Sequence, residues 1–303
     1  MITRVTQRML TGRELTSVET ASTRMAKAQE QMTTGKKINR PSDDPAHLST
    51  ALKARSGITQ QTQYQRNADD GIAWLSTIDT TIQSATTQVR RAYTLAVQGA
   101  NTATASSSSN EALADEIDQI TQSVMGLANT TYLGRPVFGG TTAGGTAYTQ
   151  DPTTGAISYV GDGGKVERRV GDGTVVRVDS SATAVFGDGT SAGGDVFQHL
   201  QDLSAALRAG SSSGIETAIG VLQNDMTRFS SALADEGARM NQITAATNVS
   251  KDTTLALQTV QTNIEDVDIA QATINLQTQN TAYQAALTAV AKTSQQSLLD
   301  YLR

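Results

Sequence analysis

The residues best suited to acid–base or metal chemistry are few and far apart. Histidine occurs only at His47 and His199, and the two are not at a spacing that binds zinc. Cysteine is absent, which removes thiol catalysis, disulfides and cysteine-based zinc sites. We therefore expect both histidines to lie at the surface or in an interface, and we predict no metal site and no cofactor.

Two pairs of adjacent carboxylates are the next candidates, since paired acids can serve general acid–base catalysis. Asp43 and Asp44 come directly before Pro45, so capping of a helix that begins at the proline explains them better. Asp69 and Asp70 lie in a helical pattern and are expected on a solvated or subunit-contacting face. The sequence therefore predicts no catalytic residue and a protein that is not an enzyme.

Three Gly-Asp-Gly triplets, centred on Asp162, Asp172 and Asp188, could bind calcium as repeated turns do in some β-helices. The repeats that bind calcium in this way have a fixed period, and these triplets are unevenly spaced, so hairpin turns are the favoured interpretation. A calcium- or carbohydrate-binding module in this segment stays open as an alternative of a different functional class.

The composition excludes other classes. The net charge is −5 and no long basic run occurs, which argues against a nucleic-acid binder. No segment approaches the roughly 18 consecutive apolar residues of a membrane span, and no apolar run follows the first ten residues as in a cleaved signal peptide. Aromatic residues make up only 4% of the chain, and many of the apolar residues are alanines. Small side chains of this kind suit close helix–helix packing.

Helical periodicity organises most of the chain. Thin apolar stripes mark both ends, and in the first stripe Ser22 and Gln29 occupy the missing steps. Gly35 is expected to end the first helix, and a linker containing Pro41 precedes a long helix that starts at Pro45. A second long stripe runs over residues 215–243, where Glu236 interrupts it.

A glycine-rich segment separates the two helical arms. Residues 165–170 and 174–179 flank Asp172 and Gly173 as a β-hairpin would, and residues 156–160 form a third strand candidate. The predicted fold is therefore mainly α with a small β insert, in which the two arms form a long antiparallel helical rod of coiled-coil type. The predicted domain segments are 1–40 and 265–303 (terminal helices), 41–138 and 195–264 (rod), and 139–194 (β insert).

Four motifs resemble the signatures of the bacterial flagellin superfamily. They are TTGKKINRPSDDPA at residues 33–46, RNADDGI at 66–72, LAVQGAN at 95–101 and IEDVDIA at 264–270. The match covers both helical arms and leaves the β insert as the variable part. Within the superfamily, RPVFGG at residues 135–140, the hairpin and the C-terminal SLLDYL are most similar to the hook–filament junction branch.

The resemblance implies an extracellular structural subunit of the bacterial flagellum, exported through the flagellar secretion channel without a cleaved signal peptide. Its implied partners are further copies of the chain in a ring or tube, hook-associated protein 1, flagellin, the export apparatus and an export chaperone. The alternative within the superfamily is a short flagellin that forms the filament itself.

The terminal stripes are the expected assembly interface, and we expect them to gain order only when neighbouring subunits complete them. The candidate residues are Ile2, Val5, Met9, Leu15, Val18, Met25, Met32, Leu276, Tyr283, Leu287, Val290, Leu298, Leu299 and Leu302.

Overall fold

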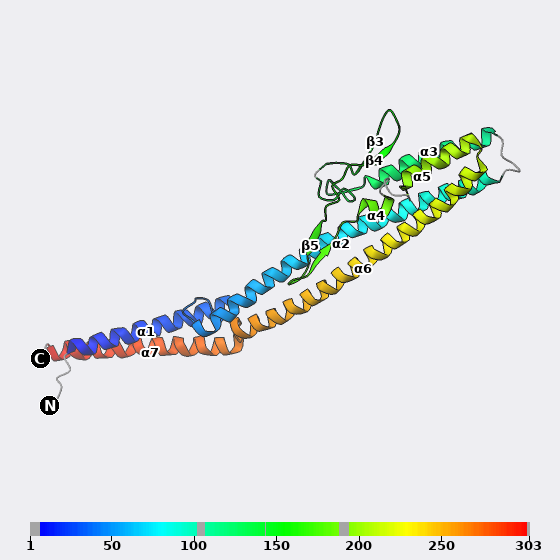
Figure 1. Cartoon of the computed structure of the whole chain (residues 1–303). Helices are drawn as coiled ribbons and strands as arrows, with labels where there is room; N and C mark the ends of the chain where they lie inside the picture. Colours follow the sequence, from blue (N-terminus) through cyan, green and yellow to red (C-terminus); the bar gives the residue numbers. More distant parts are fainter. Residues whose placement is uncertain (1–6, 102–106, 143, 188–193, 302–303) are drawn as a thin grey trace. The chain divides into compact units, whose positions relative to one another are not determined.

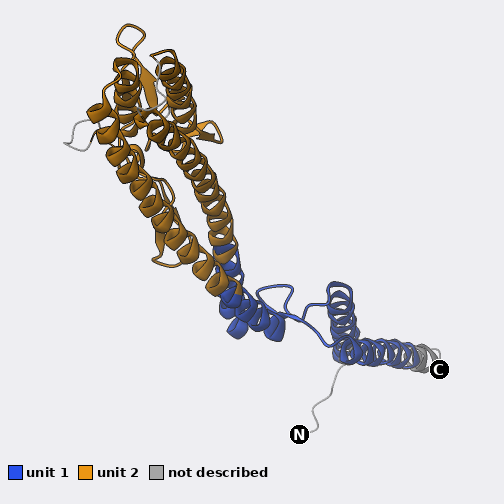
Figure 2. Cartoon of the chain, turned by 90° about the vertical axis from the view of Figure 1, so that its right-hand side faces the viewer, with its two compact units in different colours: residues 1–60, 252–303 blue, residues 61–251 orange. Residues whose placement is uncertain are grey.

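The computed structural model describes residues 7–101, 107–142, 144–187 and 194–301. The chain divides into two compact units: unit 1 contains residues 1–60 and 252–303, and unit 2 contains residues 61–251 (Figure 2). The divisions fall inside α2 (Pro45–Ala100) and α6 (Ser212–Glu265).

In unit 1, α1 (Gln7–Thr34) and α7 (Ile269–Tyr301) lie side by side (Figure 1). They are antiparallel, because Val267 N donates to Gly35 O at the start of the pair and the Thr273 hydroxyl approaches Met32 Sδ at 3.6 Å one turn further along. Gly35, at φ +67°, ends α1 as expected, because the left-handed region favours glycine.

The start of α2 follows the predicted capping chemistry. His47 N donates to Asp44 Oδ1 at 3.1 Å, which satisfies one of the free N–H groups of the first turn. Pro45 occupies the first helical position, where a missing N–H costs nothing. The helix then continues to Ala100.

In unit 2, α2 and α6 run antiparallel. Ser250 Oγ donates to Gln61 O at 3.2 Å, whereas Gln223 Nε2 donates to Tyr93 OH at 3.2 Å much further along both helices. At Gly71 a Cβ would lie only 3.2 Å from Ile243, so this glycine allows close approach of the two helices. The predicted antiparallel rod is confirmed.

Two shorter helices, α3 (Ser107–Ala128) and α5 (Val196–Ala209), pack on each other in unit 2 (Figure 1). Asp195 caps α5 by accepting a hydrogen bond from Gln198 N, and Gly210 ends it in the left-handed conformation. The buried face of α3 carries Leu113, Ile117, Ile120 and Val124.

Among the described residues, the β structure consists of three separate antiparallel hairpins, the first of which precedes the predicted insert at 139–194, and a short helix, α4 (Ala182–Phe186), follows them. The pairs are β1 (Thr131–Tyr132) with β2 (Arg135–Pro136), β3 (Tyr148–Gln150) with β4 (Ile157–Tyr159), and β5 (Glu167–Arg169) with β6 (Val175–Arg177). The predicted hairpin around Asp172 and Gly173 and the predicted strand at residues 156–160 are confirmed as β5–β6 and β4.

The first three strands, β1 to β3, show what the sequence pattern missed. The Asn129 side chain holds the start of β3 by accepting from Ala147 N and Tyr148 N, both at 2.8 Å. The β1–β2 turn places Leu133 and Gly134 at positive φ, which is uncommon for leucine. Both features depend on contacts rather than on a run of β-forming residues.

Aromatic residues are rare in the chain and concentrated where the β insert meets the helices. All four phenylalanines are buried, and Phe186 lies 5.1–5.8 Å from the rings of Phe138, Phe197 and Phe229. Tyr148 joins the same cluster from β3. The insert therefore shares one hydrophobic core with the helices of unit 2.

The predicted fold class, mainly α with a small β insert, is confirmed. The predicted domain segments at 40/41, 138/139, 194/195 and 264/265 remain a prediction. Within the described residues, no helix is both long and apolar enough to cross a membrane.

Candidate assembly surface

The contact between α1 and α7 is built on a regular seam. On α1, the half-buried and buried side chains recur at alternating steps of four and three, the spacing of a coiled-coil interface. The α1 seam residues are Glu14, Val18, Ala21, Met25, Ala28 and Met32. The α7 seam residues follow the same spacing and are Ala272, Leu276, Gln279, Tyr283, Ala286 and Val290.

This seam is thin. Among the described side chains of the two helices, only Ala28 (3% exposed) and Ala272 (5% exposed) are fully buried. Both lie near the base of the pair, and both are small. The sequence pattern placed the polar Ser22 and Gln29 at the steps between the large apolar residues of α1. In the structure, the seam positions at these steps are Ala21 and Ala28.

The predicted interface residues divide into three groups. Six lie in the seam: Val18, Met25, Met32, Leu276, Tyr283 and Val290. Three are exposed: Met9, Leu15 and Leu287. The other five are not described: Ile2, Val5 and Leu302 lie outside the described residues, and Leu298 and Leu299 belong to α7 but their side chains are not described.

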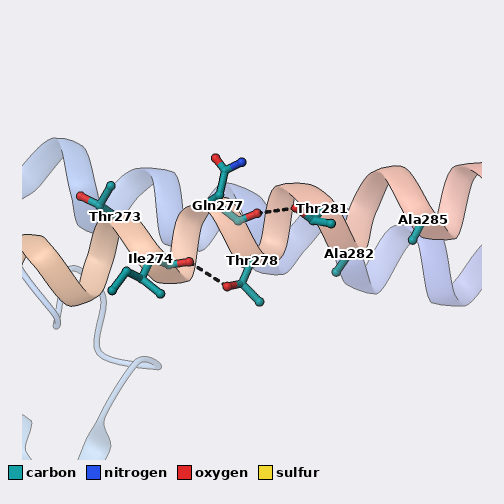
Figure 3. Close-up of a pocket in the computed structure, with 7 residues that line it drawn as sticks. All are labelled: Thr273, Ile274, Gln277, Thr278, Thr281, Ala282 and Ala285. Carbon is teal, nitrogen blue, oxygen red and sulfur yellow. Dashed lines mark hydrogen bonds between the residues drawn. The ribbon is translucent and has the colours of Figure 1, made fainter.

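A shallow groove of about 760 Å³ follows another face of α7 (Figure 3). Its lining residues are Thr273, Ile274, Gln277, Thr278, Thr281, Ala282 and Ala285. Ile274 is 60% exposed there. These positions recur at a helical period and alternate with the seam positions, so α7 has one face against α1 and another without a partner in this chain's described residues.

The threonines make this groove more apolar than their type suggests. Thr278 Oγ1 donates to Ile274 O at 2.8 Å, and Thr281 Oγ1 donates to Gln277 O at 3.0 Å (Figure 3). Thr273 Oγ1 donates to Ile269 O at 2.7 Å in the same way. Because the hydroxyls are satisfied within the helix, burying this face under a partner leaves few donors unpaired.

Charge separates the two helices of the pair. From Ile269 to Ala291, α7 contains no Asp, Glu, Lys or Arg, whereas α1 contains both acidic and basic residues. Charged residues are depleted at the centres of protein interfaces because their desolvation is costly. The groove is therefore suited to docking an uncharged, largely apolar surface.

A buried ion pair closes the base of unit 1, which we call the Glu265 latch (Lys36, Arg55, Gln261 and Glu265). Glu265 is 1% exposed, and Arg55 reaches it with Nε at 2.7 Å and Nη2 at 2.8 Å. Lys36 Nζ lies 3.3 Å away, and Gln261 Nε2 donates at 3.1 Å. Lys37 N also donates to the Glu265 carbonyl. The latch joins the loop after α1 to the ends of α2 and α6.

The pKa of Glu265 follows from these contacts. Burial alone would raise the pKa, but the hydrogen bonds from Arg55, Gln261 and Lys36 outweigh it and lower the pKa to about 2. In the sequence, Glu265 stands out only as part of the motif at residues 264–270. Its partners Lys36 and Arg55 lie 229 and 210 residues away along the chain, so periodicity could not find them.

Acid should therefore open the latch. Because the pKa of Glu265 is lowered on folding, its contribution to stability is present above pH 4.5 and is lost as the pH falls towards 2. We expect amide exchange in the loop after Gly35 to accelerate over that interval, after correction for intrinsic rates. A Glu265→Gln variant should keep only the part of this acceleration that comes from Asp43, whose pKa is also lowered to about 2 in the same loop; a profile identical to that of the wild type would contradict the latch.

The carboxylate pairs considered for catalysis have structural partners. Asp43 accepts from Asn39 N at 3.1 Å and Arg40 N at 2.9 Å and pairs with Lys27 at 2.9 Å. The hydrogen bond from Lys27 is the main reason why the pKa of Asp43 is lowered to about 2. Asp43 thus shapes the loop that leads into α2.

Asp70 differs from expectation. It pairs with Arg168 of β5 at 2.7 Å and accepts from Tyr132 OH at 3.3 Å, so it contacts the β insert of its own chain.

The expectation that His199 lies at the surface or in an interface also needs correction. Its side chain is buried, and Nδ1 lies 2.7 Å from Asp225, which is itself fully buried. Arg168, the partner of Asp70, and Asp225, the partner of His199, both belong to other elements of the chain, so the sequence alone could not place them.

The aspartates of the Gly-Asp-Gly triplets also have partners. Asp162 accepts from Gly164 N at 2.9 Å and from Thr141, and Asp172 pairs with Arg169 at 3.0 Å. Asp188 lies outside the described residues. Among the described side chains, no group of three potential metal ligands occurs.

Known proteins share this architecture. Residues 5–143 match the bacterial flagellin N-terminal helical region, and residues 218–302 match the bacterial flagellin C-terminal helical region. The chain is 25% identical over 305 residues to flagellar hook-associated protein 3 of Escherichia coli (strain K12), covering 93% of this chain and 94% of that protein.

Two further similarities are partial. A flagellin of Clostridium tyrobutyricum is 31% identical over 127 residues, which cover 42% of this chain and 33% of that protein, so the chain matches about a third of that relative's length. The crystal structure of the flagellar junction protein FlgL from Legionella pneumophila matches with a TM-score of 0.61 at 13% identity, over 72% of this chain and 100% of that chain. This last similarity is one of fold.

Proposed function

Because this chain belongs to the bacterial flagellin family and has both of its terminal helical regions, we propose that it is the hook–filament junction subunit of a flagellum, an adapter that joins hook-associated protein 1 to flagellin. The observation that carries the proposal is the nearly end-to-end alignment with a hook-associated protein 3. The protein acts as a structural component and not as an enzyme.

The α1–α7 pair supplies the assembly surface. Its seam holds the two helices together within one subunit, and the α7 groove and the exposed Met9, Leu15 and Leu287 remain for neighbours. The groove on α7 and the exposed Met9 and Leu15 on α1 are different surfaces, and contacts between different surfaces build rings or helical arrays rather than closed dimers. A ring or tube of copies is the form that a joint between two tubes requires.

The remaining partners follow from the same proposal. The subunit leaves the cell through the flagellar export apparatus, with an export chaperone covering its ends, and is extracellular once assembled. Thin terminal helices suit this route, because a chain that must pass a narrow channel cannot do so with a stable folded end.

A second candidate is a short flagellin that forms the filament itself, and the 31% identity with a flagellin favours it. A strain lacking the gene separates the two functions. The adapter predicts complete hooks, no filaments and flagellin released into the medium, together with immunogold label confined to the hook–filament boundary. Label along whole filaments, or long filaments grown from the purified protein alone, would support the flagellin.

The terminal helices should be weakly protected in the free monomer. Fixing a residue costs about 1–2 kcal/mol, and the pair buries only two alanines fully among its described side chains. We expect amide protons of α1 and α7 beyond the latch to exchange within seconds in the monomer and to become protected in isolated flagella. Strong protection of both helices in the monomer would contradict ordering on assembly, and the buried α3 is the internal control.

A further inference from the structure

Glu236 occupies a position where the apolar stripe of α6 should continue. It stands between Leu233 and Met240 on the same helical face, and its side chain is only 1% exposed. A charge is rarely buried in a helix–helix interface unless it is fully paired. The contacts of Glu236 therefore decide whether it is a structural ion pair or something else.

The segment that follows β6 covers this carboxyl. Asp179, also 1% exposed, is fully paired: Arg177 donates to it from Nε at 2.9 Å and from Nη2 at 2.7 Å, and Val166 N donates at 2.7 Å. Arg239 Nη1 donates to the Asp179 carbonyl at 2.8 Å. These bonds fix the end of the β5–β6 hairpin against α6.

Glu236 itself is poorly satisfied. Arg239 Nη1, already used by Asp179, lies 3.4 Å from Glu236 Oε1. Oε2 is buried and finds no hydrogen-bond partner in the described part of the chain. A buried carboxylate oxygen without a donor is costly when ionised, whereas a proton on that oxygen removes the charge.

The charged groups around the Glu236 carboxyl have other partners or only a long contact with it. Arg177 and Asp179 face Glu236 from the hairpin, and Arg239 and the exposed Asp235 belong to its own helix. On α2, Asp70 pairs with Arg168 of β5 at 2.7 Å. None of these groups supplies a second short contact to Glu236.

We propose that Glu236 is a proton-operated clasp of the β insert: the protonated carboxyl holds the β5–β6 hairpin closed on α6, and its ionisation loosens the hairpin. Burial raises the pKa of Glu236 to about 7, with the neighbouring Asp179 and Asp235 adding to the shift and Arg239 and the Ser180 side chain opposing it. In the loosened state the carboxyl regains its ordinary pKa of 4.5.

The direction of the effect follows from these two states. A group whose pKa is raised in the closed state favours closure most below pH 4.5. Opening then increases about tenfold per pH unit until the pH reaches about 7, and it levels off above that value. The clasp thus responds across the pH range that separates mildly acidic from neutral surroundings.

Trp74 provides a local optical readout. It is the only tryptophan, it is 2% exposed, and the Arg168 guanidinium of β5 lies 5.9 Å from its ring. Movement of the hairpin separates this cation from the ring and changes the emission of the indole. Amide exchange of residues 166–178 reports on the same movement independently.

The test compares the full-length chain with Glu236→Gln between pH 5 and 7.5. In the wild-type protein, exchange of residues 166–178, corrected for intrinsic rates, should rise more than about tenfold, and Trp74 emission should titrate with it. Glu236→Gln should be flat at the low-pH level. Glu216→Gln, an exposed change on the same helix, should titrate like the wild type.

Two results would overturn the clasp. One is a Glu236→Gln profile with the same pH dependence as the wild type, which would assign the titration to a different group. The other is a midpoint near the ordinary value of glutamate when the Glu236 carboxyl carbon is followed by NMR in the wild-type protein. This second measurement needs no variant, so it decides the matter even if Glu236→Gln fails to fold.

Discussion

Arg55→Met is expected to destabilise the base of unit 1 by about 2–4 kcal/mol, as measured by native-state amide exchange of the loop after Gly35 and the end of α6. Glu265 is 1% exposed and receives its two shortest contacts from Arg55. Without them, the buried carboxylate retains only Lys36 and Gln261. The expected cost is placed below that of a fully buried pair because the Arg55 side chain is 48% exposed.

A matched pair on the surface supplies the control. Arg91 contacts Glu116 at 2.8 Å, a distance like that in the latch, but both side chains are substantially exposed. Arg91→Met should therefore leave the stability almost unchanged. Adding Glu265→Gln to Arg55→Met should restore part of the loss, because it removes the stranded charge. Equal effects of Arg55→Met and Arg91→Met would refute the latch.

Ile274→Asp is expected to reduce incorporation into flagella by more than tenfold while leaving the monomer folded. Ile274 is 60% exposed in the groove, so the aspartate remains hydrated in the free subunit and the thermal unfolding curve should be unchanged. Docking an apolar partner would bury the new charge without a counter-ion, at a cost of several kcal/mol. The measurement is immunoblotting of isolated flagella from a deletion strain that expresses the variant.

Val175→Asp is the control that shows whether any exposed aspartate reduces incorporation or only one in the α7 groove. Val175 lies on β6 and is also a largely exposed apolar side chain, and the β insert is the part that the proposed function leaves outside the assembly surface. This variant should be incorporated like the wild type. If both variants were incorporated normally, the α7 groove would not be an assembly contact. If both failed, the defect would not be specific to the groove.

The Glu265 latch and the α7 groove have different roles in unit 1. The latch fixes the base of the terminal pair through contacts inside one chain, and the groove lies along α7, where the seam buries little surface. A subunit of this kind can present a folded base and a weakly ordered end at the same time. Assembly would then add order to the end without rearranging the base.

Much of the fold could be predicted from local patterns. The caps at Gly35 and Asp44, the hairpin around Gly173 and the stripe of α3 all depend on residues within a few positions of each other. Antiparallel packing of the arms also followed, because a chain with two helical arms and an insert between them has few other ways to bury both stripes. Six of the predicted interface residues accordingly lie in the α1–α7 seam.

The rest depended on partners far away in the sequence. The search for a stripe of large apolar residues missed Ala21 and Ala28. These small side chains lie in the seam because the register between α1 and α7 brings the two helices close together there. It also passed over the groove, because threonine counts as polar until the helix satisfies its hydroxyl. Glu265 and Glu236 carried no distinguishing pattern beyond their places in a motif and a stripe.

By itself, then, the sequence determined the helical arms, the position of the β insert and the family. It did so because helix periodicity, caps and turns are local. The tertiary structure alone decided which side chains lie inside the terminal seam and which remain for neighbours. It also decided that Glu265 has several close donors whereas Glu236 has only a long contact with Arg239 and a buried Oε2 without a donor, because the pKa of a buried carboxyl depends on the donors that other segments bring to it.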